Sequence, residues 1–311
     1  MTNERTAAVL EARVEALEYM QQQLDAPLLR QAALTELQLL AELLNDTGYD
    51  RETGVRLHHL AARTAGLCAE HAAAFGDSAA AERFNVTSIQ MSTTVGCAQM
   101  AAYYTTSLAS MHLEAGSAED SLQLVESARH IVSDPPPYLV ALWSACEAQA
   151  WALLGREKAA VRALEAAFAS YLATPAAADP AMRFATNRWL TPRWLDGIAG
   201  MTWFHLGEPR RALPHFASLL EGPLTVSPAG PSHTARELLY AAKAHLAAGN
   251  PDEAVRGAER AMGVLSVLPT HLLHQLRRTF SSHQAVPSVQ ALLARIAEGV
   301  ETCAAPHAEA F

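Results

Sequence analysis

The sequence is poor in aromatic residues and in alternating apolar patterns. Phe, Trp and Tyr make up only 6% of its 311 residues, although half of the chain is hydrophobic. Alanine dominates that hydrophobic half, and alanine combines the highest helix propensity with little value in a strand. Because no run of alternating apolar residues occurs either, the composition argues against a β-sandwich and predicts an all-α protein packed through small side chains.

Lysine, paired cysteines and long apolar runs are also scarce or missing. Only Lys158 and Lys243 are lysines, and the formal net charge is −9. We therefore expect no direct binding to nucleic acid, whose phosphates need a concentrated basic surface. The cysteines form no CxxC pair, which favours a reduced, cytoplasmic setting. They are Cys68, Cys97, Cys146 and Cys303. Without an 18-residue apolar segment or an apolar signal core, we expect no membrane span and no leader.

Five glycines recur at intervals long enough for a pair of helices, and each glycine is followed by a short turn. The intervals between them are 40, 39, 52 and 42 residues. They are Gly76, Gly116, Gly155, Gly207 and Gly249. A glycine at such a place suits a left-handed helix C-cap. The pattern then predicts Asp77, Ser117 and Asn250 as caps of the following helices, and Pro209 and Pro251 in first helical turns.

Small residues keep a fixed register to these glycines. Five positions after each glycine stand Ala81, Ser121, Ala160, Ala212 and Ala254. Seven positions before it stand Ala69, Ala109, Ala148, Gly200 and Ala242. Twelve positions after it stand Ser88, Ala128, Ala167, Leu219 and Ala261. This is the packing skeleton of a tetratricopeptide helix–turn–helix unit. Because one unit cannot bury its apolar stripe alone, we predict a right-handed superhelix, an α-solenoid of about 14 helices with helical caps.

Four segments follow from this register. Residues 1–50 are predicted to form an N-terminal helical hairpin cap, and residues 51–268 the tetratricopeptide-like repeats. Residues 269–300 are predicted to form C-terminal capping helices, and residues 301–311 a flexible tail. Helical caps of this kind shield the apolar ends of a stacked array.

Several phrases resemble the tetratricopeptide sensor region of actinobacterial XRE-like helix-turn-helix transcriptional regulators. Among them are LAARTAGLCAEHAAAFGDSAAAERF, LVALWSACEAQAWALLG, FHLGEPRRALPHF and YAAKAHLAAGNPDEAVRGAERAM. The resemblance covers roughly residues 15–299. It implies an effector, a small molecule or a peptide, bound on the concave face, with a homodimer or another protein partner as the readout. The DNA-binding domain of such regulators would precede the hairpin, and it is not found here. Either that domain has been removed or the natural protein lacks it; because Met1 opens the chain, we favour a stand-alone protein without the domain.

The repeat register also predicts which side chains face the groove. In units of this kind the concave face is formed mainly by the first helix, at positions 13, 10, 6 and 3 before the glycine. Apolar and aromatic side chains with a few polar ones are typical of a small-ligand pocket, and arginine can hold a carboxylate in a bidentate way. The predicted groove residues are Arg63, Tyr103, Gln149, Asn187, Arg193, Trp194, Met201, Phe204, Arg236 and Lys243. The competing interpretation is ordinary packing between repeats beneath a solvated rim.

The most aromatic segment, from Asn187 to Phe204, admits two interpretations of the same kind. Trp194 could form the wall of a pocket in which Asn187 or Arg193 anchors a ligand, or it could belong to the core. Trp203 falls where the repeat buries a large aromatic side chain, so we expect it in the core.

Metal and nucleophile motifs are weak. The pairs His58/His59, Cys68/His71 and His271/His274 supply at most two ligands each, whereas zinc needs more, so we expect no metal and no cofactor. No GxSxG elbow occurs, and Cys97 at a helix start is more simply a small packed residue. The acid pairs Glu119/Asp120 and Asp252/Glu253 lie in first helical turns, where they complement the helix dipole.

Three functions remain open on the sequence alone. The first is a non-enzymatic sensor that binds a ligand or peptide in its concave groove. The second is a small-molecule-binding enzyme or resistance protein of a natural-product pathway that reuses the same fold, since fold does not fix function. The third is a protein–protein scaffold without a small ligand.

Overall fold

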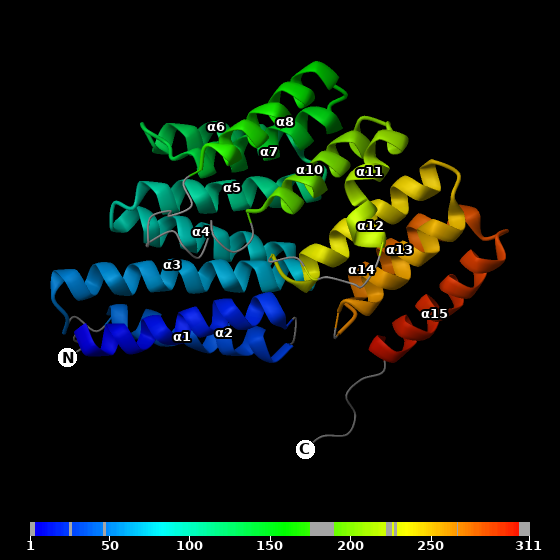
Figure 1. Ribbon diagram of the computed structural model, residues 1–311. Helices are drawn as coiled ribbons and strands as arrows, with labels where there is room; N and C mark the ends of the chain where they lie inside the picture. The colour runs from blue at the N-terminus through cyan, green and yellow to red at the C-terminus, as the bar shows by residue number, and fades with distance from the viewer. Residues whose placement is uncertain are drawn as a thin grey trace.

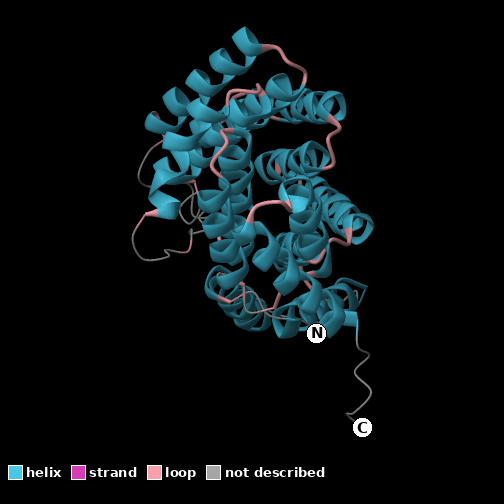
Figure 2. Cartoon of the chain, turned by 90° about the vertical axis from the view of Figure 1, so that its right-hand side faces the viewer, coloured by secondary structure: helices cyan, strands magenta, loops and turns pink. Residues whose placement is uncertain are grey.

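The protein is all-helical over the residues that the structure describes. The computed structural model describes residues 4–24, 27–45, 48–174, 190–221, 226, 229–265 and 267–304. Over these residues it contains 14 α-helices, is 84% helical and has no strand. Figure 2 shows the same composition as helices joined by loops. Within the described residues no helix is at once long enough and apolar enough to cross a membrane.

Most helices pack on the next helix along the chain, although α13 packs on α15 rather than on α14. Their bounds in the first half are α1 Glu4–Gln23, α2 Pro27–Asn45, α3 Arg51–Ala74, α4 Ser78–Thr94, α5 Ala98–Glu114, α6 Ala118–Ile131, α7 Pro137–Leu153 and α8 Glu157–Leu172. Those in the second half are α10 Pro192–His205, α11 Pro209–Leu220, α12 Pro231–Ala247, α13 Pro251–Gly263, α14 Thr270–Phe280 and α15 Pro287–Ala304. A short 3₁₀ turn, Ser281–His283, separates the last two.

The helices are arranged as a curved array, consistent with an α-solenoid. Each second helix packs on the first helix of its own pair, and the first helices α3, α5, α7, α10 and α12 also pack on one another in chain order or through the second helices between them. In Figure 1 the array rises from α1 and α2 through α3 and α5 to α7 and α8, then descends through α10 and α12 to α15.

All five predicted glycine turns are confirmed. The backbone φ angles of the glycines are positive, between 67° and 84°, and each glycine lies between the two helices of one pair. A side chain would be strained in that conformation, so the glycine both ends one helix and sets the reversal. Gly96 adopts the same conformation between α4 and α5, a turn that the repeat pattern does not include.

The small residues in register with these glycines form the contact between paired helices. The five residues five positions after the glycine are all 0% exposed, and so is Ser88. Gly200 shows why one position tolerates no side chain, because a Cβ there would meet the Phe216 ring, which is itself 0% exposed. Close approach of paired helices therefore buries even the smallest side chains completely.

The helices start at the predicted positions, but only one of the three predicted N-cap side chains makes a capping hydrogen bond. The side chain of Asp77 accepts a 3.0 Å hydrogen bond from the Ala80 amide, as predicted. Ser117 and Asn250 occupy N-cap positions but make no capping hydrogen bond with their side chains, so that part of the prediction is wrong. Pro209 and Pro251 are the first residues of α11 and α13, where a missing amide hydrogen costs nothing.

The terminal segments fold as helices with slightly different limits. The predicted N-terminal hairpin consists of α1 and α2, and the predicted closing helices are α14 and α15. Helix α15 continues to Ala304, four residues into the segment 301–311 that the sequence predicts as a tail. Residues 305–311 lie outside the described part of the chain.

Contacts between segments far apart in sequence bring the last helices back to the first. His271 at the start of α14 lies against the α3–α4 turn, where a Cβ on Gly76 would be 2.8 Å from its Nδ1. His271 also makes a hydrogen bond to the backbone of Phe75. At the start of α12, a Cβ on Gly230 would be 3.2 Å from the Gln21 carbonyl oxygen of α1. The curved array therefore closes far enough for its later helices to touch α1 and α3.

Candidate functional site

Two cavities are lined mainly by the first helices of successive pairs. Four of the ten predicted groove residues line the first, which we call the central cavity; it has about 480 Å³ of empty space, including solvent at its mouth. It lies between α5, α7, α10 and α12. Its lining residues are Ser110, Leu113, Glu114, Ala145, Cys146, Gln149, Leu153, Trp194, Ile198, Met201, His205, Arg236 and Tyr240.

The lining of the central cavity follows the repeat register with a small rotation. The positions that recur are 13, 9, 6 and 2 before each glycine, instead of the predicted 13, 10, 6 and 3. In α10 this set is complete, as Trp194, Ile198, Met201 and His205. Both sets form one stripe along a helix, since steps of three and four residues alternate around a period of 3.6.

The wall of the central cavity is apolar where α10 and α12 face each other. Trp194 is 8% exposed and Met201 only 2%, so both belong to the core and to the cavity wall at once. Thr191 fixes the start of α10, because its hydroxyl oxygen accepts a 3.2 Å hydrogen bond from the Trp194 amide. Trp194 is therefore both a core residue and part of the cavity wall, so its two interpretations do not exclude each other.

Two uncharged polar side chains of the cavity, Ser110 and Gln149, come from α5 and α7. The side-chain amide of Gln149 is half-buried at the cavity and makes no hydrogen bond to a described residue. Ser110 Oγ lies 3.3 Å from Cys146 Sγ. Gln149 thus offers an amide donor and an acceptor to whatever occupies the space.

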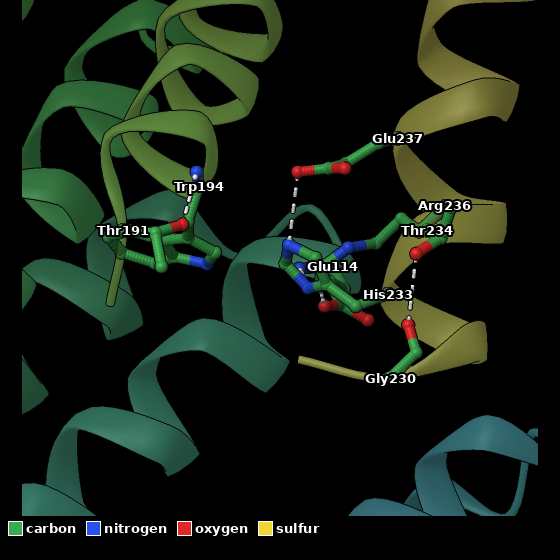
Figure 3. A network of polar contacts seen from close by, with 8 residues as sticks. All are labelled: Glu114, Thr191, Trp194, Gly230, His233, Thr234, Arg236 and Glu237. Atoms are coloured by element: carbon green, nitrogen blue, oxygen red, sulfur yellow. Dashed lines mark hydrogen bonds and ion pairs between the residues drawn. The ribbon is translucent and has the colours of Figure 1, made fainter. Parts of the chain in front are cut away.

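Arg236 and Glu114, which line the cavity, belong to a chain of polar contacts with His233 (Figure 3). Arg236 forms an ion pair through Nη1 with Glu114 of α5. Its Nη2 donates a 2.7 Å hydrogen bond to Nδ1 of His233, while its Nε is buried with no hydrogen bond. Because Nδ1 accepts, the ring proton of a neutral His233 is on Nε2. Desolvation lowers the pKa of Arg236, but a guanidinium stays charged at neutral pH.

Glu237 extends this chain into the protein interior. It is 1% exposed, and neither carboxylate oxygen makes a hydrogen bond. Nε2 of His233 lies 3.2 Å from Oε1 of Glu237 without hydrogen-bond geometry. The absence of a side chain at Gly197 makes the room, because a Cβ there would collide with that carboxylate. The sequence predicted Gly197 on the groove face but not the carboxylate that it accommodates.

Two titratable side chains on the cavity wall, those of Cys146 and His205, are held in uncharged forms. Desolvation raises the pKa of the Cys146 thiol to about 11, so no thiolate nucleophile is available near neutral pH. Desolvation, aided by Lys243, lowers the pKa of His205 to about 4, which makes it a weak base. These wall residues are suited to binding rather than to nucleophilic or acid–base chemistry.

Phe204 and Lys243, two predicted groove residues, lie beside the cavity instead of lining it. The Phe204 and Tyr240 rings meet edge to face, with centroids 5.7 Å apart. Lys243 Nζ is 4.8 Å from the centroid of the Tyr240 ring, and desolvation lowers its pKa to about 8. Both side chains therefore support Tyr240, which does line the cavity.

The second cavity, which we call the N-terminal cavity, lies between α1, α3 and α5. Its lining residues are Glu18, Gln21, Gln22, Arg63, Gly66, Leu67, Glu70, Tyr103, Tyr104 and Ala229. Arg63 is bound there by both oxygens of Glu18, at 2.7 and 2.8 Å. Burial disfavours the charge of Arg63, yet this pair raises the pKa of its guanidinium overall.

Glu70 is the other carboxylate of the N-terminal cavity. It accepts a hydrogen bond from the Gln21 amide. Although its side chain keeps contact with solvent, the helices around it desolvate the carboxylate and raise its pKa to about 7. The nearby Glu18 raises the pKa further, whereas Gln21 and His233 act in the opposite direction.

The predicted groove residues therefore divide into five groups. Gln149, Trp194, Met201 and Arg236 meet at the central cavity, and Arg63 and Tyr103 at the N-terminal one. Phe204 and Lys243 lie beside the central cavity. Arg193 lines neither cavity, and Asn187 falls outside the described residues. Six of the ten predicted residues thus line one or the other of the two cavities.

Some functional candidates were missed from the sequence. Tyr240, His205 and Glu114 were not predicted because the cavity face is rotated by one position from the predicted face. Moving two of the four register positions by one residue would have found them. Glu18 and Gln21 escape because the prediction treats α1 as an end cap. Trp203, by contrast, is 8% exposed in the core beneath the Arg211 guanidinium, as predicted for a packing residue.

No metal site is evident in the described part of the chain, where no three His, Cys, Asp or Glu side chains are grouped suitably. Comparison with known proteins gives no assignment either: no family model matches the chain, and no curated protein is significantly similar to it. What the two cavities do is therefore inferred from their own residues.

Proposed function

We propose that this protein is an effector-binding sensor, a tetratricopeptide-like right-handed superhelix that binds a small molecule in its central cavity. The observation that carries the proposal is the convergence of first helices from four successive pairs on one cavity. That cavity combines an apolar wall with the unpaired amide of Gln149 and the Arg236–Glu114 pair. A mostly apolar pocket with a few polar groups is the usual composition of a small-ligand site.

The extent of the cavity favours a small molecule over a peptide. A peptide in extended conformation would need a longer channel, because each residue spans about 3.3 Å. Contacts between later helices and α1 or α3 also shorten the available path.

Binding would act by shifting a population of conformations. The ligand would contact α5, α7, α10 and α12 at once, so it would favour the curvature at which all four helices meet it. Small changes at each pair add up along a repeat array. The resemblance to regulator sensor regions supports a homodimer or another protein partner as the recipient of that change.

Thermal shift measurements against a collection of small molecules and short peptides test this proposal. A ligand present at a hundredfold excess over its Kd stabilises the folded state by about 2.7 kcal/mol, which raises Tm by several degrees. Small molecules should produce such shifts, and Gln149→Leu should weaken them.

The matched control is Gln90→Leu, at an exposed position on α4 away from both cavities. It should leave the Tm shifts unchanged. The proposal fails if no compound raises Tm, or if the two variants weaken binding equally.

A further inference from the structure

The N-terminal cavity carries a carboxylate, that of Glu70, which forms no ion pair with a described residue. We propose that this cavity is a second binding site and that its ligand is a small primary amine, whose ammonium group pairs with Glu70. The inference does not depend on the proposed function, because the two cavities have no lining residue in common. It follows from the balance of charge and of hydrogen-bonding groups around Glu70.

The charged side chains that line the N-terminal cavity do not balance one another. They are Glu18, Arg63 and Glu70. Arg63 is held by both oxygens of Glu18, at 2.7 and 2.8 Å, so this pair carries no net charge. Glu70 therefore leaves a negative charge on the lining whenever its carboxylate is ionised. A bound cation would balance that charge, whereas a bound anion would add to it.

His233, whose charge also acts on Glu70, is engaged elsewhere. Its Nδ1 accepts the hydrogen bond from Arg236, and its Nε2 lies 3.2 Å from Oε1 of Glu237 (Figure 3). Glu237 is buried, and neither of its oxygens has a hydrogen bond to a described residue. It therefore competes with Glu70 for any positive charge on the His233 ring, and His233 is no substitute for a direct counter-ion at Glu70.

Two oxygen atoms at the cavity accept no hydrogen bond from a described residue. Gln21 donates through Nε2 to Oε2 of Glu70, which leaves Oε1 of Glu70 and Oε1 of Gln21 unused. The Gln21 oxygen is also buried, and a buried acceptor without a donor is costly. A primary ammonium carries three donors and no acceptor, so it supplies what this part of the cavity lacks.

The surroundings of Glu70 strengthen a charge pair formed there. Its side chain keeps contact with solvent, so a ligand can reach it, yet the helices around it desolvate the carboxylate and raise its pKa to about 7. An ion pair that is partly removed from water is stronger than one on an open surface. A cation beside Glu70 would favour the ionised form, so the amine and the proton compete for the same carboxylate.

Three short probes test the inference by chemical-shift titration of the full chain at constant ionic strength: butylammonium, butanol and butyltrimethylammonium. Their short hydrocarbon body suits the apolar part of the lining, Leu67 and the rings of Tyr103 and Tyr104. Butylammonium should bind about tenfold more tightly than butanol, as expected for a hydrogen bond to a charged group. Butyltrimethylammonium keeps the charge but has no N–H donor, so its affinity should fall between the two. Glu70→Gln should remove the advantage of butylammonium over butanol.

The pH dependence of binding identifies the carboxylate. Between pH 6 and pH 8 the affinity for butylammonium should rise about tenfold, because Glu70 loses its proton around pH 7 while an alkylammonium keeps its own. Around Glu70 stand Glu18, Arg63, Tyr104 and His233. Histidine also changes charge in this range, so His233→Gln is compared. The rise should persist in His233→Gln and vanish in Glu70→Gln; the opposite result overturns the assignment to Glu70.

Glu157→Gln is the matched control, because Glu157 is 61% exposed and pairs with Arg211 away from the cavity. It should change none of the affinities. Equal affinity for butylammonium and butanol overturns the inference, and so does a preference for butylammonium that survives in Glu70→Gln, since the cation would then bind elsewhere on this acidic chain. If no probe binds, this inference fails. The sensor proposal fails separately, when no compound raises Tm through the central cavity.

Discussion

Arg63 and Arg236 occupy equivalent places in the repeat, thirteen positions before Gly76 and Gly249, yet their surroundings differ. Arg63 is bound by both oxygens of Glu18, and the side chains of this pair are 12% and 7% exposed. Arg236 is held by Glu114, which is 48% exposed, and its Nε is unused. The acidic partner, and not the position in the repeat, therefore decides whether such an arginine is fixed in a buried pair or keeps an unused hydrogen-bond donor.

This difference separates the roles of the two cavities. In the N-terminal cavity the charge of Arg63 is already neutralised by α1, so the pair joins the terminal hairpin to the first repeat. In the central cavity the corresponding charge is only loosely satisfied. The same helical scaffold thus places one arginine in a buried structural pair and another in a pair that is accessible to water.

The largest expected effect comes from breaking the buried pair. Glu18→Gln should lower the free energy of unfolding by about 3 kcal/mol, because it removes the carboxylate that pairs with the largely buried guanidinium of Arg63. Urea denaturation of the full-length variant would measure this. A loss below about 1 kcal/mol, the range of exposed ion pairs, would show that the two arginines do not differ as described.

A second test compares two glycines that stand ten positions before their turn glycines, Gly66 and Gly197. A Cβ on Gly66 would overlap the Tyr104 ring, which is 3% exposed and confined. We expect Gly66→Ala to cost about 1–3 kcal/mol through overpacking, even after the gain in helix propensity. Gly257→Ala is the control, because a Cβ there would lie 3.4 Å from Ala242 in ordinary contact. It should be neutral or stabilising in the same denaturation experiment.

The outcome at Gly197 would sharpen the same comparison. Its neighbour is the terminal carboxylate of Glu237, which can rotate where a ring cannot. Gly197→Ala should therefore destabilise less than Gly66→Ala. The reverse order would indicate that Glu237 is held more rigidly than Tyr104.

A smaller effect, dependent on pH, is expected at Glu70. Its pKa in the folded protein is raised to about 7 from 4.5 by desolvation, so the folded state retains a proton that the unfolded state has lost between these values. The contribution of Glu70 to stability is therefore fully present below pH 4.5 and is lost as the pH rises to 7. Glu70→Gln should be more stable than the wild type at pH 8, by no more than about 1 kcal/mol because solvent screens the exposed carboxylate. At pH 5 most of the difference should vanish; a gain independent of pH would contradict the assignment.

The smallest effect on stability is expected at Glu114. Glu114→Gln should change the free energy of unfolding by less than about 0.5 kcal/mol, since the pair that it breaks is accessible to water. Urea denaturation at low and high salt would check this. A destabilisation equal to that of Glu18→Gln would mean that both arginines are structural.

Local features of the fold were predictable because neighbouring residues determine them. The turn at Gly155 and the burial of Ala160 depend on one helix pair, and both follow from the spacing of small residues. The register of Gln149 and Met201 on the cavity face follows from the same spacing. The spacing of residues within one repeat is therefore enough to predict the turn, the buried small residues and the face that lines the cavity.

Features that join distant segments could not be predicted in this way. Glu18 pairs with Arg63 across 45 residues, and Glu114 with Arg236 across a longer interval. Which acidic side chain meets which arginine depends on how strongly the array curves, and no single repeat encodes that curvature. The one-position rotation of the cavity face has the same origin, because steps of three and four residues are equally compatible with one apolar stripe.

The contact between His271 and the turn at Gly76 has a consequence for unfolding. A linear stack of repeats loses structure from its termini, where each outermost unit has a neighbour on one side only. Here the outermost units lean on interior ones, so neither terminus offers an easy place for melting to begin. Deleting the final helix pair should accordingly loosen the α3–α4 reversal, nearly two hundred residues upstream, in hydrogen exchange.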